Sequence, residues 1–206
     1  FSHESVIELA KYATIPVIYG LTDLLHPCQA LADLFTIQEK MKVLKGRKMV
    51  YVGDGNNMAH SLMYAAAKVG MNMVCACPKG YQPDPKVLAE AQEDASQTGC
   101  TITVEEDVMK AVKGADVLYT DTWASMGQEE EHDARKKIFA PYQINAELLA
   151  AARPEAIVMH CLPAYRGEEI TDDVIEGPQS VVFDQAENRL HVQKAIMALL
   201  MSDERL

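Results

Sequence analysis

The sequence predicts an α/β fold with a doubly wound, mostly parallel sheet and helices on both faces. Short runs rich in β-branched and other apolar residues alternate with longer segments in which apolar residues recur at helical spacing. A glycine-containing turn at residues 53–57 connects one such run directly to a helix, as in a βα unit. Hydrophobic residues make up 49% of the 206 residues and charged residues 24%, which is typical of a globular protein. Repeated βα units call for parallel strands joined by right-handed crossovers.

Residues 1–45 are expected to lie beside the sheet rather than in it. Residues 2–12 predict a short helix and residues 15–18 a strand-like run, and Pro27 begins a helix that continues to about residue 43. Proline is favoured at this position because the first helical residue has no intrahelical partner for its N–H. A single short strand before a long helix places this region in a neighbouring layer.

From residue 46 onward, expected strands and helices alternate. The strands are predicted at residues 48–52, 73–76, 101–104, 117–120 and 157–160, with a short one at 181–183. The helices are predicted at residues 58–69, 86–97, 105–113, 145–151 and 187–201. The charged segment at residues 128–137 is assigned no element.

Charge and cysteine usage exclude several classes of protein. The net charge of −11 argues against nucleic-acid binding, which needs clustered Lys and Arg to contact phosphates. No apolar stretch reaches the ~20 residues that a membrane helix needs. The five cysteines show no paired spacing, so reduced thiols in a cytoplasmic protein fit best, and Cys75 and Cys77 are expected in the core. The chain begins with Phe1 in a helix-like run, so we expect it to be a piece of a longer protein.

Polar residues gather where this fold binds ligands, at the carboxyl ends of strands and at the helix N-termini beside them. Four segments stand out, at residues 26–29, 54–57, 121–127 and 160–163. Each is richer in functional side chains than a plain surface turn.

The segment that begins Gly53-Asp54-Gly55 resembles the start of a Rossmann-like dinucleotide-binding loop. The rest of that fingerprint is missing, because Met58 occupies the third glycine position and no acidic residue follows the second strand. Two interpretations remain besides nucleotide binding. The segment is a glycine-rich turn with a capping asparagine, or a polar loop in which Asn57 holds the backbone of an amino acid.

His26 and Gln29 lie near a helix N-terminus, which suits an anion such as phosphate. Alternatively, His26 is a helix cap or a packed core histidine. Asp121 ends an apolar strand, where a carboxylate needs water or a cationic partner, and an amine substrate would supply one. The alternative is that Asp121 only caps its loop. Ser125 and Met126 add a hydroxyl and main-chain groups to the same loop.

Cys161 directly follows His160, which suggests a nucleophile with its base. Adjacent residues of a strand point to opposite faces, so His160 is poorly placed to deprotonate Cys161. A structural thiol is the alternative, and no complete Cys–His arrangement supports thioester chemistry.

Taken together, the HPxQ, DGNN, DxxxSMG and HCLP segments resemble those of the ornithine carbamoyltransferases, in the same order. The likeness extends to residues 30–33 and 186–189, and so runs over almost the whole chain. It implies transfer of a carbamoyl group from carbamoyl phosphate to ornithine, giving citrulline in arginine biosynthesis, or the reverse, degradative direction. It implies no cofactor and no metal.

The resemblance also implies a role for individual residues. The implied contacts to carbamoyl phosphate come from His26, Gln29, Cys161, Leu162 through its backbone, and Arg189. The implied ornithine contacts come from Asn57, Asp121, Ser125 and Met126, and catalysis would fall to Cys161, Asp121 and Arg189.

These implied roles agree with the chemistry that the reaction requires. An alkyl ammonium with a pKa of about 10.4 has no lone pair, so it must lose a proton before it attacks a carbonyl. Asp121 and a thiolate at Cys161 would orient the ammonium and assist this step, while donors at the carbamoyl oxygen stabilise the intermediate.

The family's S-x-R-T phosphate-binding loop has no counterpart in this sequence. We therefore expect a helical segment at residues 1–45 that leads to an absent carbamoyl-phosphate domain, and an ornithine-binding α/β domain at residues 46–185. A C-terminal helix at residues 186–206 would pack back on the absent domain. The parent enzyme would form a homotrimer or a multiple of trimers, and this chain alone would bind ornithine weakly and show negligible catalysis.

Other interpretations stay open. The acceptor could be putrescine or N-acetylornithine, although Ser125-Met126-Gly127 favours ornithine. Aspartate fits poorly, because Asp121 would repel its second carboxylate. The chain could also be a non-catalytic amino-acid-binding domain. A dinucleotide-binding protein is a third interpretation, although the glycine fingerprint is incomplete.

Overall fold

In the computed structural model, which describes residues 2–124 and 132–202, five parallel strands form a single sheet. The strands are β1 (Lys48–Val52), β2 (Asn72–Ala76), β3 (Ile102–Glu105), β4 (Val117–Thr120) and β5 (Ile157–His160). Their order across the sheet is β3-β2-β1-β4-β5, and every neighbouring pair is parallel. β2 and β3 are added on one side of β1, and β4 and β5 are added on its other side. The border between β1 and β4 is therefore the topological switch point.

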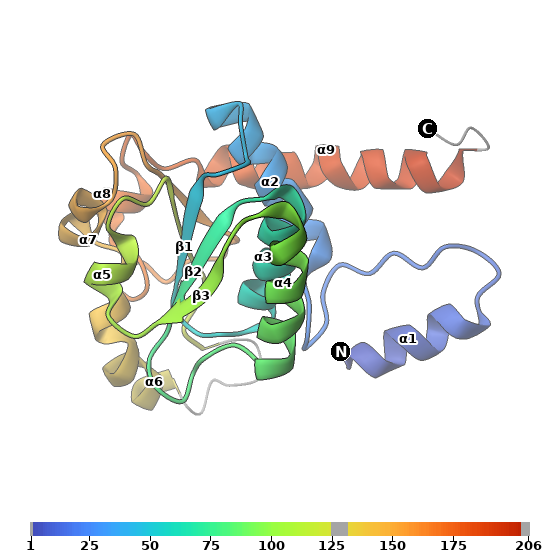
Figure 1. Ribbon diagram of the computed structural model, residues 1–206, viewed down its shortest axis with the longest axis horizontal. Helices are drawn as coiled ribbons and strands as arrows, with labels where there is room; N and C mark the ends of the chain where they lie inside the picture. Colours follow the sequence, from blue (N-terminus) through green and yellow to red (C-terminus); the bar gives the residue numbers. More distant parts are fainter. Residues whose placement is uncertain (1, 125–131, 203–206) are drawn as a thin grey trace.

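Helices cover both faces of this sheet, as predicted (Figure 1). On one face lie α2 (Pro27–Met41), α3 (Asn57–Val69) and α4 (Pro85–Thr98), and on the other lie α5 (Val108–Val112), α7 (Ala146–Ala151) and α8 (Asp172–Ile175). The side chains of β1 alternate, with Met49 and Tyr51 toward α2–α4 and Val50 and Val52 toward the other face.

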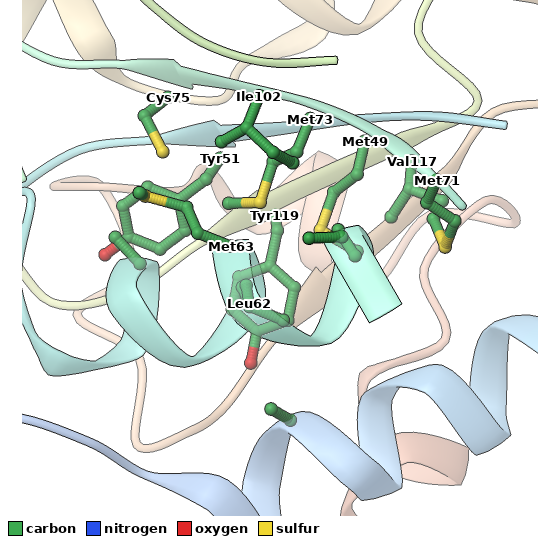
Figure 2. Packing of buried hydrophobic residues seen from close by; sticks show 14 of the residues in the cluster. Met49, Tyr51, Leu62, Met63, Met71, Met73, Cys75, Ile102, Val117 and Tyr119 are labelled. Carbon is green, nitrogen blue, oxygen red and sulfur yellow. The ribbon is translucent and has the colours of Figure 1, made fainter. Parts of the chain in front are cut away.

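The core under α3 is rich in methionine and contains two tyrosines. Figure 2 shows Met49, Met63 and Met73 packed between the sheet and α3, together with Tyr51 and Tyr119. The rings of these two tyrosines are stacked at a centroid distance of 6.0 Å. Methionine fills such irregular gaps because its side chain is unbranched and flexible. The Tyr51 hydroxyl donates to Oδ1 of Asn56 in the loop after β1, and the Tyr119 hydroxyl donates to Oδ2 of Asp33 on α2.

The long C-terminal helix α9 (Val182–Met201) packs along α2. The expected short strand at 181–183 is wrong, because only Ser180 bridges to Val158 of β5 and the next residues already turn into α9. The expected strand at 15–18 is also wrong. Ile15 is 74% exposed, and no strand in the described part of the chain pairs with this segment.

Three described elements lie outside the predicted pattern, namely α8, α6 and a 3-10 helix, and the first helix stands apart from the sheet. The charged segment contains α6 (His132–Phe139), followed by a 3-10 helix η2 (Ala140–Tyr142). The first helix, α1 (His3–Tyr12), has no buried residue and stands away from the sheet in Figure 1. Among the described helices, none is both long and apolar enough to cross a membrane.

The cysteines behave as the sequence predicts. All five are free, and Cys75 and Cys77 are fully buried. Burial raises the pKa of the Cys75 thiol to about 12, so this residue is an inert part of the core.

Candidate functional site

The predicted polar residues meet at the carboxyl edge of the sheet, next to the switch point. The loop after β1 supplies Asn56, the end of β4 supplies Asp121, and the end of β5 supplies Cys161. The N-terminus of α2 and one face of α9 border the same region with His26 and Arg189. This is the place where open parallel sheets bind ligands.

Asp121 and Cys161 contact each other directly. The Cys161 thiol donates to Oδ1 of Asp121 at 3.0 Å, and the Thr122 N–H donates to the same oxygen at 2.8 Å. The Asn56 amide donates to Oδ2 at 2.9 Å. Within residues 2–124 and 132–202, no cationic side chain forms an ion pair with this carboxylate, although three donors hold it in place.

The surroundings of Cys161 do not favour the expected thiolate. Burial first, and then the neighbouring carboxylate of Asp121, raise the pKa of the Cys161 thiol well above its ordinary value. The charged groups that act most on this thiol, Asp121 and Asp33, are both acidic. Cys161 is therefore a neutral hydrogen-bond donor.

The two asparagines of the DGNN segment have different partners. Asn56 caps α3, because its Oδ1 accepts from the N–H groups of Met58 and Ala59 at 2.9 and 3.3 Å. The amide of Asn57 donates to the carbonyl of Thr22 at 2.6 Å, which ties the N-terminal arm to this loop. The capping asparagine of the sequence analysis is thus Asn56, which also contacts Asp121.

Backbone packing explains the glycine of this loop. A Cβ at Gly55 would lie 2.2 Å from the backbone nitrogen of Pro83, so only glycine fits. The loop packs against residues 81–83, and the Gly55 N–H donates to the Tyr81 carbonyl at 2.8 Å. Close chain packing therefore explains the glycine without a nucleotide.

A buried ion pair braces the same loop. Nη1 of Arg135 lies 2.7 Å from Oδ2 of Asp54 and also donates to the Trp123 carbonyl at 3.0 Å. Burial raises the pKa of the Asp54 carboxyl, and the hydrogen bond and charge of Arg135 oppose this effect. Sequence reasoning missed Arg135, because nothing in the charged segment indicated that one arginine turns inward.

Gln29 and Arg189 form the second part of the site. Gln29 is 1% exposed, its Nε2 donates to Oδ1 of Asp33 at 2.8 Å, and its Oε1 accepts from Arg189. Burial, and then the charge of Arg189, lower the pKa of His26, so this histidine is neutral. The charge of Asp121 also acts on His26, which places His26 within reach of both parts of the site.

His26 is not a side-chain helix cap, contrary to one interpretation of the sequence. It occupies the N-cap position of α2, but its ring makes no capping hydrogen bond. Its backbone N–H donates to the Ser61 hydroxyl at 2.6 Å, and its Nδ1 is buried without a hydrogen-bond partner.

Contacts around His160 shape the HCLP turn. Nδ1 of His160 accepts from the Leu162 N–H at 2.8 Å, and Nε2 lies 3.0 Å from Oε1 of Glu169. Both ring nitrogens are therefore occupied, and His160 is not a base for Cys161. Leu162 has a positive φ of 57° and precedes a cis peptide bond to Pro163.

One group of possible metal ligands lies at this turn. The ligand atoms of Asp121, His160 and Cys161 lie within 4.8 Å of one another. Each of these atoms is already engaged in a protein hydrogen bond, so we assign no metal to them. Two expected ornithine contacts, Ser125 and Met126, lie outside the described residues.

The fold and the site define an α/β domain whose candidate site lies next to the switch point of a parallel sheet, where such folds bind ligands. The family model of the aspartate/ornithine carbamoyltransferase Asp/Orn binding domain matches residues 45–200, and the model of the carbamoyl-P binding domain matches residues 1–39. The chain belongs to the aspartate/ornithine carbamoyltransferase family.

Named relatives agree with this assignment. The chain is 61% identical over 201 residues to an ornithine carbamoyltransferase of Thermococcus kodakarensis, covering 98% of this chain and 64% of that protein. It is 59% identical over 201 residues to an anabolic ornithine carbamoyltransferase of Pyrococcus furiosus, with the same coverage of both chains. The chain thus spans about 64% of the length of these curated relatives.

Solved structures show the same fold. The ornithine carbamoyltransferase structure from Pyrococcus furiosus superposes with a TM-score of 0.96 at 58% identity, covering 100% of this chain and 66% of that one. The more distant ornithine transcarbamoylase of Giardia lamblia, at 36% identity, gives a TM-score of 0.92 and covers 99% and 69%. The α/β fold predicted from the sequence is therefore confirmed.

Proposed function

We propose that this chain is the ornithine-binding part of an ornithine carbamoyltransferase, which converts carbamoyl phosphate and L-ornithine to L-citrulline and phosphate. The main support is the Asp121–Cys161 pair at the switch point, a carboxylate held by three donors and with no cation paired to it among the described residues. A carboxylate so placed suits the side-chain ammonium of an amino acid. The names of the relatives support the same substrates.

On the ornithine side, Asp121 would hold the ammonium group while Cys161 and Asn56 keep the carboxylate oriented. The ammonium must release one proton before its nitrogen attacks the carbamoyl carbon. A new N–C bond then forms, the C–O bond to phosphate breaks, and the second proton leaves the nitrogen as phosphate departs. Asn57, Ser125 and Met126 are proposed to bind the amino-acid end of ornithine.

On the carbamoyl phosphate side, Arg189 would supply positive charge, which suits the oxygen atoms of the ligand, where negative charge grows in the transition state. His26 is proposed as a further contact through its Nδ1, which has no hydrogen-bond partner among the described residues. Gln29 and the Leu162 backbone complete the set of proposed contacts, and Cys161 lies between the two ligands. Arg189 and Gln29 are already hydrogen-bonded to each other, which supports a shared role.

The phosphate end of this ligand is proposed to lie on a carbamoyl-phosphate domain that residues 1–45 lead into. The match of the carbamoyl-P domain model to residues 1–39 supports this placement. Exposed apolar side chains on α1 and at the end of α9, such as Leu9 at 61% and Met201 at 82%, suit a covering domain. We retain residues 46–185 as the ornithine domain, with α9 beginning at Val182 and crossing the boundary. We also propose a trimeric, cytoplasmic enzyme of arginine biosynthesis.

Citrulline formation tests the proposal. The chain, together with any coding sequence that precedes it, is assayed with carbamoyl phosphate and either ornithine, putrescine or N-acetylornithine. We expect ornithine to be the preferred acceptor. Preference for another amine would reassign the substrate, and binding of ornithine without turnover would indicate a non-catalytic domain.

Two variants test the proposed roles at the carboxylate. Asp121→Asn and Cys161→Ala are expected to lower kcat with ornithine, Asp121→Asn by about 10²-fold or more, the usual range for a residue that takes part in proton transfer. Cys100→Ala is the matched control, because Cys100 is a partly exposed thiol between α4 and β3. Full activity of Cys161→Ala would refute the role given to that thiol.

A further inference from the structure

A carboxyl group with no assigned role lies behind Gln29. Asp33 is on α2, one helical turn after Gln29, and is 0% exposed. Its Oδ1 accepts from Nε2 of Gln29 at 2.8 Å and from Nε2 of Gln185 at 2.7 Å, and its Oδ2 accepts from the Tyr119 hydroxyl at 3.0 Å. All of its polar partners are donors, and they come from α2, α9 and β4.

We propose that Asp33 is a positioning residue that holds the Gln29 carboxamide with its oxygen toward the ligand, and so makes the site select a phosphate ester that carries an N–H donor. This inference rests on the proposed function, because it concerns recognition of the carbamoyl group. It adds a residue that does not touch the ligand and that acts through Gln29.

The orientation of Gln29 follows from charge and hydrogen-bond polarity. A glutamine amide has a donating end and an accepting end of nearly equal size. In the orientation found, the NH₂ group faces the Asp33 carboxyl and the oxygen faces the Arg189 guanidinium. The reverse orientation would place oxygen against oxygen and NH₂ against a cation, so both contacts would become repulsive.

The same orientation holds for either protonation state of Asp33. A neutral carboxyl keeps one acceptor oxygen, which can remain Oδ1 between the two glutamine amides. Its proton would then lie on Oδ2 and donate to the Tyr119 oxygen. An asparagine at this position reproduces that pattern, because its oxygen replaces Oδ1 and its NH₂ replaces the protonated Oδ2.

The consequence is chemical selectivity. Gln29 presents only an acceptor to the site, so it can form a hydrogen bond with a ligand N–H but not with a methyl group. Carbamoyl phosphate has an NH₂ where acetyl phosphate has a CH₃, and the two molecules are otherwise similar in shape and charge. Leaving a buried acceptor without its donor typically costs about 1–3 kcal/mol, or roughly 5- to 150-fold in affinity.

Asp33 also fixes a second amide in the same way. Nε2 of Gln185 donates to Asp33, so its Oε1 faces the backbone N–H of His160. This Oε1 accepts a hydrogen bond from that N–H at 3.0 Å. His160 in turn accepts from the Leu162 N–H. One carboxyl group thus orients Gln29 on one side of the site and supports the HCLP turn on the other.

The test compares equilibrium binding of carbamoyl phosphate and acetyl phosphate to the chain with any coding sequence that precedes it. The wild-type protein is expected to prefer carbamoyl phosphate. Asp33→Leu, which removes both acceptors, is expected to reduce that preference at least tenfold, mainly by weakening carbamoyl phosphate. Asp33→Asn is expected to keep it within about twofold.

A matched control lies one turn further along α2. Thr36 is also fully buried and accepts a hydrogen bond from Asn188 of α9 at 3.0 Å, but it has no link to Gln29. Thr36→Val therefore removes a contact across the same helix pair and is expected to leave the preference unchanged. If Asp33→Leu does not fold, Asp33→Ser is measured in its place, with the same expected loss.

The outcomes separate this inference from the proposed function. An unchanged preference in folded Asp33→Leu or Asp33→Ser overturns the positioning role, as does an equal loss in Thr36→Val. Wild-type protein that prefers carbamoyl phosphate in binding, but forms no citrulline from ornithine, contradicts the proposed function and leaves the role of Asp33 supported by its variants. Wild-type protein without any preference overturns the inference.

Discussion

Replacing Asp33 with asparagine should change how the stability of the protein depends on pH. Burial raises the pKa of the Asp33 carboxyl from 3.8 to about 7, against the opposing effect of its hydrogen bonds to Gln29, Gln185 and Tyr119 and of the charge of Arg189. Between these two pH values the folded protein holds a proton at Asp33 that the unfolded chain has released. The asparagine variant has no such group.

The sign and size of the effect follow from this difference. When the folded state binds the extra proton, the free energy of unfolding falls by about 1.4 kcal/mol for each pH unit of increase. The contribution of Asp33 to the free energy of unfolding is fully present below the pKa of 3.8 in the unfolded chain. It is lost as the pH rises through the pKa of about 7 in the folded protein. From pH 5 to pH 8, wild type should therefore lose about 3 kcal/mol relative to Asp33→Asn.

Urea unfolding followed by circular dichroism at pH 5, 6, 7 and 8 measures the difference. Other titrating groups are common to both proteins and cancel in the comparison. Thr36→Val serves as the control and should differ from wild type by the same amount at every pH. If the free energies of unfolding of wild type and Asp33→Asn differ by the same amount at every pH, the raised pKa is refuted. If wild type instead gains stability relative to Asp33→Asn as the pH rises, the three donors outweigh burial.

Three other predictions concern reactivity and packing. The pKa of the Cys161 thiol is raised in the folded protein, so less of the reactive thiolate is present there. At pH 8 this thiol should react with iodoacetamide at least about tenfold more slowly in the folded protein than in the urea-unfolded chain. Peptide mass spectrometry measures both rates. Equal rates would contradict a neutral thiol. Leu62→Ala, at a fully buried position, should lower the free energy of unfolding by about 2–5 kcal/mol, while Leu31→Ala, at a position 47% exposed, should lower it by much less. Gly55→Ala should lower it by about 1–3 kcal/mol, because its Cβ meets the backbone nitrogen of Pro83. Gly20→Ala, with nothing within 4 Å of the new Cβ, should change it by less than about 0.5 kcal/mol, and equal losses at both glycines would refute the packing argument.

Local pattern was sufficient for most of the fold. The strands at residues 48–52 and 117–120 have the bounds that their apolar runs predict, and α2 begins at Pro27 as expected. These features depend on neighbours in the sequence, so period, proline position and turn glycines reveal them. The same holds for the family resemblance, which rests on short segments that are each continuous in the chain.

Local pattern failed where partners distant in the sequence decide the structure. Residues 15–18 look like a strand, but a strand needs a neighbour, and the described chain provides none there. Residues 181–183 have strand-like side chains, yet they start α9 because packing against α2 and β5 favours a helix over a weak propensity. Arg135 lies in a charged run, and partners distant in the sequence, among them Asp54 and the Trp123 carbonyl, account for its inward course.

For the site, the sequence by itself determined which chemical groups are available and on which loops they stand. Only the tertiary structure decided their states and their contacts. Cys161 is a neutral thiol because burial and Asp121 surround it, and Gln29 presents its oxygen because Asp33 occupies the space behind it. Such properties depend on dielectric environment and on hydrogen-bond polarity across elements up to 160 positions apart, as for Gln29 and Arg189. No pattern of neighbouring residues contains that information.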